Sequence, residues 1–340
     1  MGLLRALRVF ETPASLLGLN CIFAIGPKHS ANVVYCVCGL GLKIAVSILC
    51  LRTVVIEMVE ATPRHLNIIN MLLLADYKFF SILLFLSVIY FHVRKDEDYR
   101  KIFATLSEVA GENYCYDELF SCLRRNSKIA GALAFGTIFC MFLLQVTQDG
   151  LGDKLDVAHS AVTAFTCMYF EIKFSVVAKA TLFVLKRVNA GVQVAAWAPN
   201  RSAELFPQLR ASHEKLYQLV EDSSQTFQCV LIFAAILQFQ VALYSSYVAC
   251  INVWELEASF MQFKIKLMLI TSIWVLAIVV NYVHLTSTCS ATLAEVNSTM
   301  LCSRVLDDIC CKKIFHGYKG ADFLMLISLL LGNIFSLFFY

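Results

Sequence analysis

The sequence predicts an all-α membrane protein with seven transmembrane helices, and two observations support this. Hydrophobic residues make up 59% of the 340 residues and charged residues only 16%, and the mean hydropathy is +0.70. Apolar stretches of about 18 residues or more also recur along the chain, and a helix of that length crosses the hydrocarbon core of a bilayer. The chain is therefore expected to cross a membrane several times.

The seven expected spans follow the apolar stretches, in chain order, at 31–53, 68–92, 128–148, 157–185, 226–250, 267–286 and 323–340. Arg52 and Lys128, at the edges of their spans, are counted with the adjoining segments. Of the 28 Lys and Arg residues, 19 then fall in the N-terminal segment and the segments after spans two, four and six, against five in the alternate segments. Because cytoplasmic loops carry the excess of basic residues, the N-terminus is expected in the cytoplasm and Tyr340 outside.

The cytoplasmic side is expected to hold more than loops. Between 202 and 227, apolar residues recur at helical spacing, and Pro207 suits a first helical turn. This pattern runs without a break into the fifth span, the fourth span runs on through Lys186-Arg187, and the segment 94–128 is periodic enough to be helical. Such extensions would form an anchor layer. The expected regions are a cytoplasmic N-terminal segment (1–30), a six-helix bundle with its extensions (31–288), and a cytoplasmic connection with the seventh helix (289–340).

The last span carries small residues at a regular spacing. Ser328, Gly332 and Ser336 follow one another every four residues, and Asn333 lies beside them. Such a stripe lets helix backbones approach closely in lipid, where burial of apolar surface no longer drives association. It fits either an ordinary packed helix or a helix that meets its own copies around an axis.

Ionisable residues lie inside two of the expected spans. Asp76 and Lys78 fall in the second span, and Glu171 and Lys173 in the fourth. Charges at membrane depth are costly and usually face each other or a polar cavity. The four are expected to form a buried charge network, either as structural pairs or in direct contact with a ligand or ion.

The outer halves of spans two to six mix polar and aromatic side chains. A mostly apolar cavity with a few hydrogen-bonding groups is what a small-molecule site requires, although any helical bundle offers similar residues. A lone histidine is also more often a packing residue than a ligand contact. The expected ligand-binding residues are Asn70, Tyr77, Gln145, His159, Thr163, Tyr169, Tyr244 and Trp274.

The sequence lacks the motifs of soluble enzymes. His213-Glu214-Lys215-Leu216-Tyr217 begins like a zinc-protease helix, but Tyr217 stands where the second histidine ligand must be. There is no GxSxG elbow, phosphate-binding loop or dinucleotide fingerprint. The fourteen cysteines are scattered, many of them within apolar spans, and are interpreted as small hydrophobic residues. No enzymatic activity, cofactor, metal site or nucleic-acid partner is therefore expected.

Three segments carry a family resemblance: Ser15–Leu19 before the first span, Leu185–Asn189 at the exit of the fourth, and the helical run 209–219 that leads into the fifth. Together they resemble the corresponding segments of an insect gustatory receptor, and the resemblance extends over nearly the full length of the chain. The family's most specific motif, in the seventh span, is Thr-Tyr, five hydrophobic residues and Gln-Phe. Here Ser336-Leu337 occupies the Thr-Tyr positions and the sequence ends at Tyr340 before the Gln-Phe positions. The motif is therefore expected to be degenerate and truncated.

The resemblance implies a ligand-gated, non-selective cation channel in the plasma membrane, opened by a small-molecule tastant. It would assemble as a homo- or heterotetramer with other gustatory receptors, with the cytoplasmic helices holding the subunits together and lipid around the bundle. The seventh helices would line the pore, and Phe339 or Tyr340 would lie near a hydrophobic constriction. The pore-lining residues implied are Ser328, Gly332, Asn333, Ser336, Phe339 and Tyr340.

Three alternatives remain open. A G-protein-coupled receptor predicts the opposite orientation, an acidic-Arg-aromatic turn after span three and Asn-Pro-x-x-Tyr in span seven, none of which the sequence shows. A transporter or membrane enzyme would use Asp76 and Glu171, but none of the five prolines lies in a span, where the broken helices of transporters would need Gly or Pro. A subunit that does not conduct alone would modify a full-length partner.

Overall fold

The computed structural model describes helices throughout, and every residue it describes is helical. The helices are α2 (His29–Glu60), α3 (His65–Tyr90), the π-helical turn η1 (Phe91–Lys95), α4 (Asp96–Ala110), α6 (Leu151–Trp197) and α7 (Pro199–Trp254). The remaining described residues are 121, 272, 275–276 and the helix 278–296. The predicted all-α class is confirmed for these residues, among which there is no strand.

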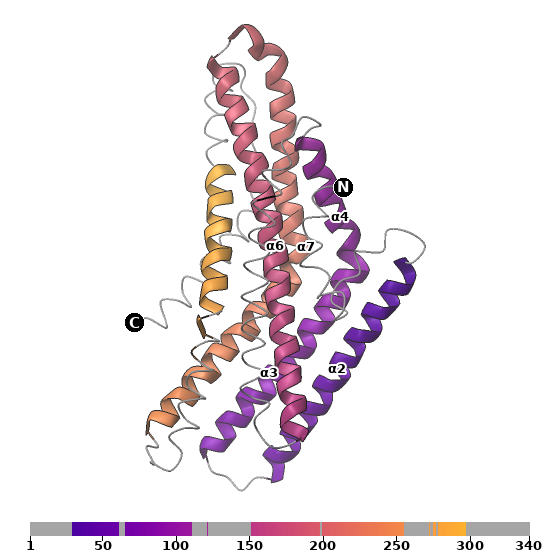
Figure 1. Ribbon diagram of the computed structural model, residues 1–340, viewed down its shortest axis with the longest axis vertical. Helices are drawn as coiled ribbons and strands as arrows, with labels where there is room; N and C mark the ends of the chain where they lie inside the picture. The colour runs from indigo at the N-terminus through magenta and orange to yellow at the C-terminus, as the bar shows by residue number, and fades with distance from the viewer. Residues whose placement is uncertain are drawn as a thin grey trace.

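The two longest helices, α6 and α7, run side by side along the long axis of the molecule (Figure 1). With 47 and 56 residues, they are about 70 and 84 Å long at about 1.5 Å per residue. A bilayer core is about 30 Å thick, so each helix is long enough to cross a membrane and project well beyond it. The predicted continuity of the segment 202–227 with the fifth span is therefore observed.

The position of Pro207 differs from the prediction. It was expected in the first turn of a helix, but α7 begins at Pro199 and continues through Pro207. A proline inside a helix removes one backbone hydrogen bond and leaves the carbonyl four residues earlier without its partner. Pro207 is exposed, so water can satisfy that carbonyl and the helix can continue past the proline.

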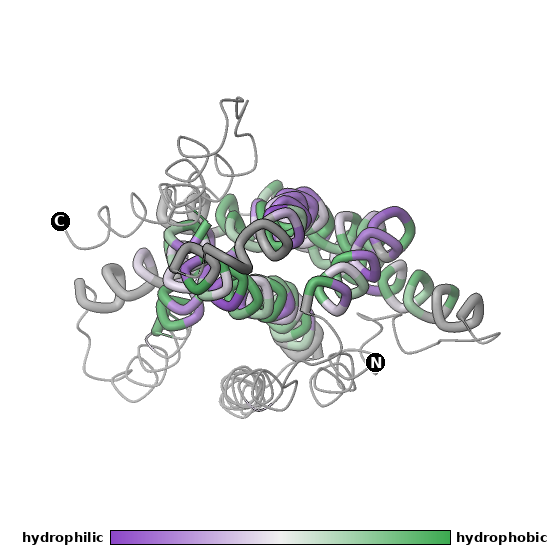
Figure 2. The backbone as a smooth tube through the Cα atoms, turned by 90° about the horizontal axis from the view of Figure 1, so that it is seen from above, coloured by the Kyte–Doolittle hydropathy of each residue, from purple (hydrophilic) through white to green (hydrophobic). Residues whose placement is uncertain are grey.

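Three of the described helical segments are long and apolar enough to cross a membrane: Cys36–Ile56, Met71–Lys95 and Pro207–Tyr244. The first two agree with the expected spans 31–53 and 68–92 to within a few residues. Viewed along the long axis, the described helices form one bundle that carries both hydrophobic and hydrophilic stretches (Figure 2).

Large apolar side chains lie on the outer surface of α2. Leu42, Ile48 and Leu49 are each more than half exposed, and the segment Cys36–Ile56 of α2 is long and apolar enough to cross a membrane. In water such a surface would be a liability, whereas lipid covers it at no cost. The burial pattern supports the conclusion that this is a membrane protein.

The fourth expected span, 157–185, lies entirely within α6. It is not among the three apolar segments, and it contains polar residues such as His159, Glu171 and Lys173. These residues are buried inside the protein, so α6 is polar where other helices surround it. The expected spans 128–148 and 323–340 lie outside the described residues, and the span 267–286 is described only in part.

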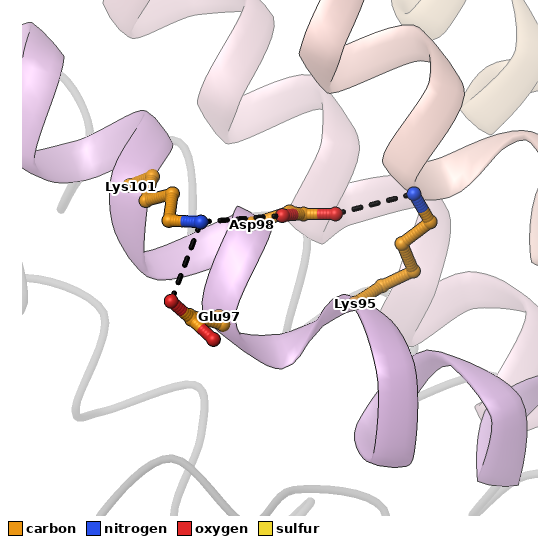
Figure 3. Close-up of polar contacts among 4 residues, drawn as sticks. All are labelled: Lys95, Glu97, Asp98 and Lys101. Carbon is orange, nitrogen blue, oxygen red and sulfur yellow. Dashed lines mark hydrogen bonds and ion pairs between the residues drawn. The ribbon is translucent and has the colours of Figure 1, made fainter.

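The second expected span, 68–92, continues through η1 into α4. The first turn of α4 begins with Asp96-Glu97-Asp98, and acidic side chains stabilise a helix N-terminus. Lys95 lies 3.1 Å from Asp98, and Lys101 lies 3.3 Å from Glu97 and 3.8 Å from Asp98 (Figure 3). Exposed ion pairs of this kind contribute about 0–1 kcal/mol each to stability, so they add little to the stability of the junction. The helix predicted over 94–128 is confirmed as far as residue 110.

Aromatic packing holds the junction of η1, α4, α6 and α7 together. The ring of Phe91 lies 5.3 Å from that of Phe170 and 5.2 Å from that of Phe227, and Tyr99 lies 6.0 Å from Phe91. All four side chains are at most 1% exposed. Tilted and edge-to-face ring pairs add about 0.5–1.5 kcal/mol each beyond the burial of their area. This aromatic junction, defined by Phe91, Tyr99, Phe170 and Phe227, fixes α4 against the two long helices.

The helix 278–296 is attached to α6. The amide nitrogen of Asn189 donates to the Glu295 carboxylate at 2.7 Å and to the Glu295 backbone carbonyl at 3.3 Å. The Thr292 hydroxyl lies 3.5 Å from the backbone oxygen of Ala178. Asn189 is the last residue of the Leu185–Asn189 segment that carries part of the family resemblance, and here it links two helices far apart in sequence.

Candidate functional site

Three buried polar groups lie at successive depths along α6, centred on His159, Glu171 and Lys173. His159 and Glu171 are twelve residues apart, which is about 18 Å along a helix. All three side chains are at most 5% exposed. Each group has its own set of neighbours, so they are described one at a time.

The His159 group joins α2, α3 and α6. The Nε2 atom of His159 lies 2.6 Å from the Oγ of Ser47, and its Nδ1 lies 3.2 Å from the Nζ of Lys78. Ser47 and Lys78 are completely buried. Polar groups buried at this depth are stable only when hydrogen-bonded, so this contact binds the three helices to one another.

The hydrogen bonds of the His159 group fix the tautomer of the imidazole. An ammonium has donors only, so Lys78 donates to Nδ1 of His159. The proton of the neutral ring is then on Nε2, which donates to the Ser47 oxygen. The Ser47 hydroxyl in turn donates to the backbone carbonyl of Lys43 at 2.8 Å. The chain of bonds therefore runs in one direction, from Lys78 through His159 and Ser47 to the Lys43 carbonyl.

Aromatic rings flank the imidazole on two sides. Tyr77 and Phe85 meet the His159 ring edge to face, with centroids 6.4 and 6.2 Å away. Thr163 lies one turn further along α6 and is 1% exposed. The result is an apolar wall around a few hydrogen-bonding atoms, which is the chemistry of a small-molecule site. Two of the predicted ligand-binding residues, Tyr77 and His159, therefore lie together.

Tyr169 and Tyr244, which were also predicted to bind ligand, do not join this group. Tyr169 lies ten residues below His159 on α6, and its ring neighbours are Phe165 and Phe170. Tyr244 is a half-buried residue of α7. The side chains that lie outside the described residues are those of Asn70, Gln145 and Trp274.

The Glu171 group joins α6, α7 and the helix 278–296. Glu171 is 2% exposed and accepts a hydrogen bond from the side-chain amide of Asn281. It accepts a second one from the side-chain amide of Gln238 on α7. Tyr282 is close enough to interact electrostatically with the carboxylate. Hydrogen bonds to a carboxylate are stronger than those between neutral groups, so Glu171 acts as the link among three helices.

Lys173 lies inside an aromatic cage. Its ammonium nitrogen is 4.2 Å from the centroid of the Tyr99 ring, 5.2 Å from Phe91, 5.5 Å from Tyr169 and 5.8 Å from Phe170. A cation over an aromatic face gains about 0.5–2 kcal/mol, the larger value when water is excluded. The cage includes three residues of the aromatic junction, so the charge of Lys173 is accommodated by rings.

The predicted buried charge network is corrected in one respect. Lys78, Glu171 and Lys173 are buried, as expected, but Asp76 is exposed. The reason is helical geometry: residues two apart lie about 200° apart around a helix, so Asp76 and Lys78 of α3 face opposite sides. The three buried side chains belong to the separate groups described above.

The predicted pore-lining residues, Ser328, Gly332, Asn333, Ser336, Phe339 and Tyr340, lie outside the described residues. The sequence analysis also missed four residues that the structure brings into the His159 group and the Glu171 group. These are Ser47, Gln238, Asn281 and Tyr282. Of these four residues, Asn281 was the one that the sequence could have marked, because it is a polar residue that directly follows the apolar run 273–280.

Comparison with solved structures identifies the architecture. The fold is similar to that of the insect olfactory receptor OR5 from Machilis hrabei, whose structure was determined in complex with eugenol, with a TM-score of 0.61 over 97% of this chain and 96% of that chain. The chain has the fold of an insect olfactory receptor. Sequence identity is 14%, so the likeness is one of fold.

The sequence comparisons add no assignment, since neither a protein-family model nor a curated protein matches the chain. The structural likeness bears on the expected resemblance at the level of architecture. It shows the fold of an insect olfactory receptor and assigns no function to the chain.

Proposed function

We propose that this protein is an insect chemoreceptor of the gustatory kind, acting in the plasma membrane as a ligand-gated, non-selective cation channel. The observation that carries the proposal is the similarity of fold, over 97% of the chain, to an insect olfactory receptor solved with a small molecule, eugenol. The proposal includes seven spans, a cytoplasmic N-terminus and a tetramer of this chain alone or with related receptors. The stripe formed by Ser328, Gly332 and Ser336 would face the tetramer axis.

The His159 group supports a ligand site on the outer side of the bundle. Tyr77, Phe85 and Thr163 would supply the wall, and His159 with Lys78 the polar contacts. A small tastant with an apolar body and one or two hydrogen-bonding groups fits this chemistry. Its binding would open the channel only to the extent that it binds the open arrangement more tightly than the closed one.

The test is a recording of ligand-evoked current. The chain is expressed in cells without endogenous chemoreceptors, and whole-cell currents are measured during application of a panel of sugars, bitter alkaloids and other small tastants. The proposal predicts a current whose reversal potential is near 0 mV and stays there when Na⁺ and K⁺ are exchanged between the two sides of the membrane. Stoichiometric uptake of a ligand without current would favour a transporter, and a response that requires a G protein would favour the receptor alternative. A current seen only with a co-expressed partner would favour a modulatory subunit.

The proposed orientation has an independent test. Asn200-Arg201-Ser202 and Asn297-Ser298-Thr299 are glycosylation sequons that a cytoplasmic position would protect. A sequon engineered into the segment 255–260 serves as the matched extracellular control. Modification of the engineered site alone supports a cytoplasmic N-terminus, and modification of the native sites would reverse the orientation.

A further inference from the structure

The side chains around Glu171 leave two buried polar atoms unsatisfied. Both amides that contact Glu171 donate to it, through Asn281 and Gln238. Within the part of the chain that the structure describes, neither the Oε1 of Gln238 nor the phenolic oxygen of Tyr282 has a hydrogen-bond partner. Gln238 is 5% exposed and Tyr282 is 8% exposed. An unsatisfied buried polar atom costs about 1–3 kcal/mol, so two at one place call for an explanation.

The chemistry of these atoms indicates which ligand would satisfy them. Because the amide N–H groups are directed to the carboxylate, the amide oxygen of Gln238 is available as an acceptor only. The same amide group contacts the Glu171 carboxylate. Tyr282, which directly follows Asn281, interacts electrostatically with that carboxylate. Three oxygens, one of them on a carboxylate, form a hard, negatively polarised set that repels anions and attracts cations.

The single carboxylate also limits the charge of the ligand. Sites for Ca²⁺ and Mg²⁺ bring several carboxylates or phosphates together, whereas one carboxylate balances one positive charge. The neighbouring Lys173 does not compete for the same space: it lies two residues along α6, about 200° around the helix, with its ammonium against the Tyr99 ring at 4.2 Å.

We propose that Glu171, Gln238 and Tyr282 form a binding site for a small monovalent cation between α6, α7 and the helix 278–296. The carboxylate balances the charge, and the amide and phenolic oxygens complete the first shell with any water that accompanies the ion. Because each oxygen comes from a different helix, occupancy of the site stabilises the arrangement in which the three helices meet. The site does not depend on the proposed channel function, since binding is measurable on the purified protein without a tastant or a current.

The experiment measures the thermal stability of the detergent-purified chain as a function of cation. NaCl is titrated against N-methyl-D-glucamine chloride at constant ionic strength, with KCl as a parallel series, and unfolding is followed by loss of the monodisperse peak in size-exclusion chromatography. A cation that binds only the folded protein raises the unfolding temperature in a saturable way. The native chain is expected to show such a shift with Na⁺ and none with N-methyl-D-glucamine.

Two variants test the residues and one serves as a matched control. Glu171→Gln is expected to lose the Na⁺-dependent shift. Tyr282→Phe removes one oxygen without changing the ring. The Na⁺ concentration that gives the half-maximal shift is expected to rise roughly tenfold in this variant, because one polar contact is lost. Glu214→Gln, at an exposed position on α7, is expected to retain the native response.

Tyr282→Phe keeps the proposal refutable even if Glu171→Gln fails to fold. Without a bound cation, removal of a buried, unsatisfied hydroxyl is neutral or stabilising in every salt. With a bound cation, the same change is destabilising in NaCl and not in N-methyl-D-glucamine chloride. The proposal is overturned if the native chain and Tyr282→Phe respond equally to both salts. It is also overturned if stability follows pH but not the cation, because a proton on Glu171 would then be the only occupant.

Discussion

The aromatic junction offers a sharp test of what holds η1, α4, α6 and α7 together, through the substitution Phe227→Leu. The Phe227 ring is fully buried and lies 5.2 Å from Phe91, 5.7 Å from Tyr99 and 5.5 Å from Phe174. Leucine keeps most of the apolar volume but none of the ring contacts. At about 0.5–1.5 kcal/mol for each ring pair, three lost pairs amount to about 3 kcal/mol.

This loss is measurable as a change in thermal stability. At about 2 °C per kcal/mol, the lower end for chains of 150–250 residues, Phe227→Leu is expected to lower the unfolding temperature by about 6 °C. Unfolding in detergent is often irreversible, so variants are compared at one heating rate. The matched control is Phe79→Leu on α3, where the ring is 49% exposed and pairs with Phe80. Equal shifts for the two variants would refute the assignment of the junction as a stabilising cluster.

Three further predictions concern other sites. Asn189→Ala removes the amide that donates to the Glu295 carboxylate at 2.7 Å. A hydrogen bond to a charged group contributes about 1.5–3 kcal/mol, so thermal unfolding is expected to show a destabilisation of that size. His159→Gln is expected to weaken any ligand-evoked current at least about tenfold in half-maximal concentration, since one or more polar contacts are lost. Burial raises the pKa of the Cys289 thiol to about 12, so maleimide is expected to leave Cys289 unlabelled at pH 8 in the folded protein and to label it after denaturation, as measured by mass spectrometry.

Each of these has a comparison that separates it from a general effect. Gln193→Ala, one turn beyond Asn189 on α6 and exposed, is expected to leave stability unchanged. His213→Gln on the N-terminal part of α7 is expected to leave the ligand response unchanged, and an equal loss in both histidine variants would contradict a ligand role for His159. Labelling of Cys289 in the folded protein at the rate of an exposed thiol would contradict its protonated, buried state.

The helical class and several boundaries could be predicted from the sequence because they depend on local composition. Apolar stretches located α2 and α3, and the periodic leucines of the segment 202–227 indicated its continuity with the fifth span. The start of α7 was missed by eight residues, since Pro207 was taken as a first-turn residue. A proline also fits a helix interior when the freed carbonyl is exposed to water, and sequence alone does not show that exposure.

The contacts of the candidate site were harder to predict. Charge and depth correctly marked Lys78, Glu171 and Lys173 as buried, but nothing in their spacing shows that Lys78 meets a histidine or that Lys173 meets four rings. Most of these partners lie on helices more than 60 residues away in sequence. Which side chains meet across two helices depends on how each helix is rotated about its axis and on the register between the two. Helical geometry would have excluded Asp76, because it lies two residues from Lys78 on the same helix.

The position of the polar groups on α6 shows how the bundle sets its register without a hydrophobic driving force between helices. In lipid, apolar faces gain little by meeting each other, and specific polar contacts decide which helices pair. His159 ties α6 to α2 and α3, while Glu171 ties α6 to α7 and to the helix 278–296. A rotation of α6 by one residue, about 100°, would break both sets of bonds and leave charges buried alone. A ligand that competes for His159 would therefore loosen α2 and α3 from α6 while the Glu171 contact still held α6 in place.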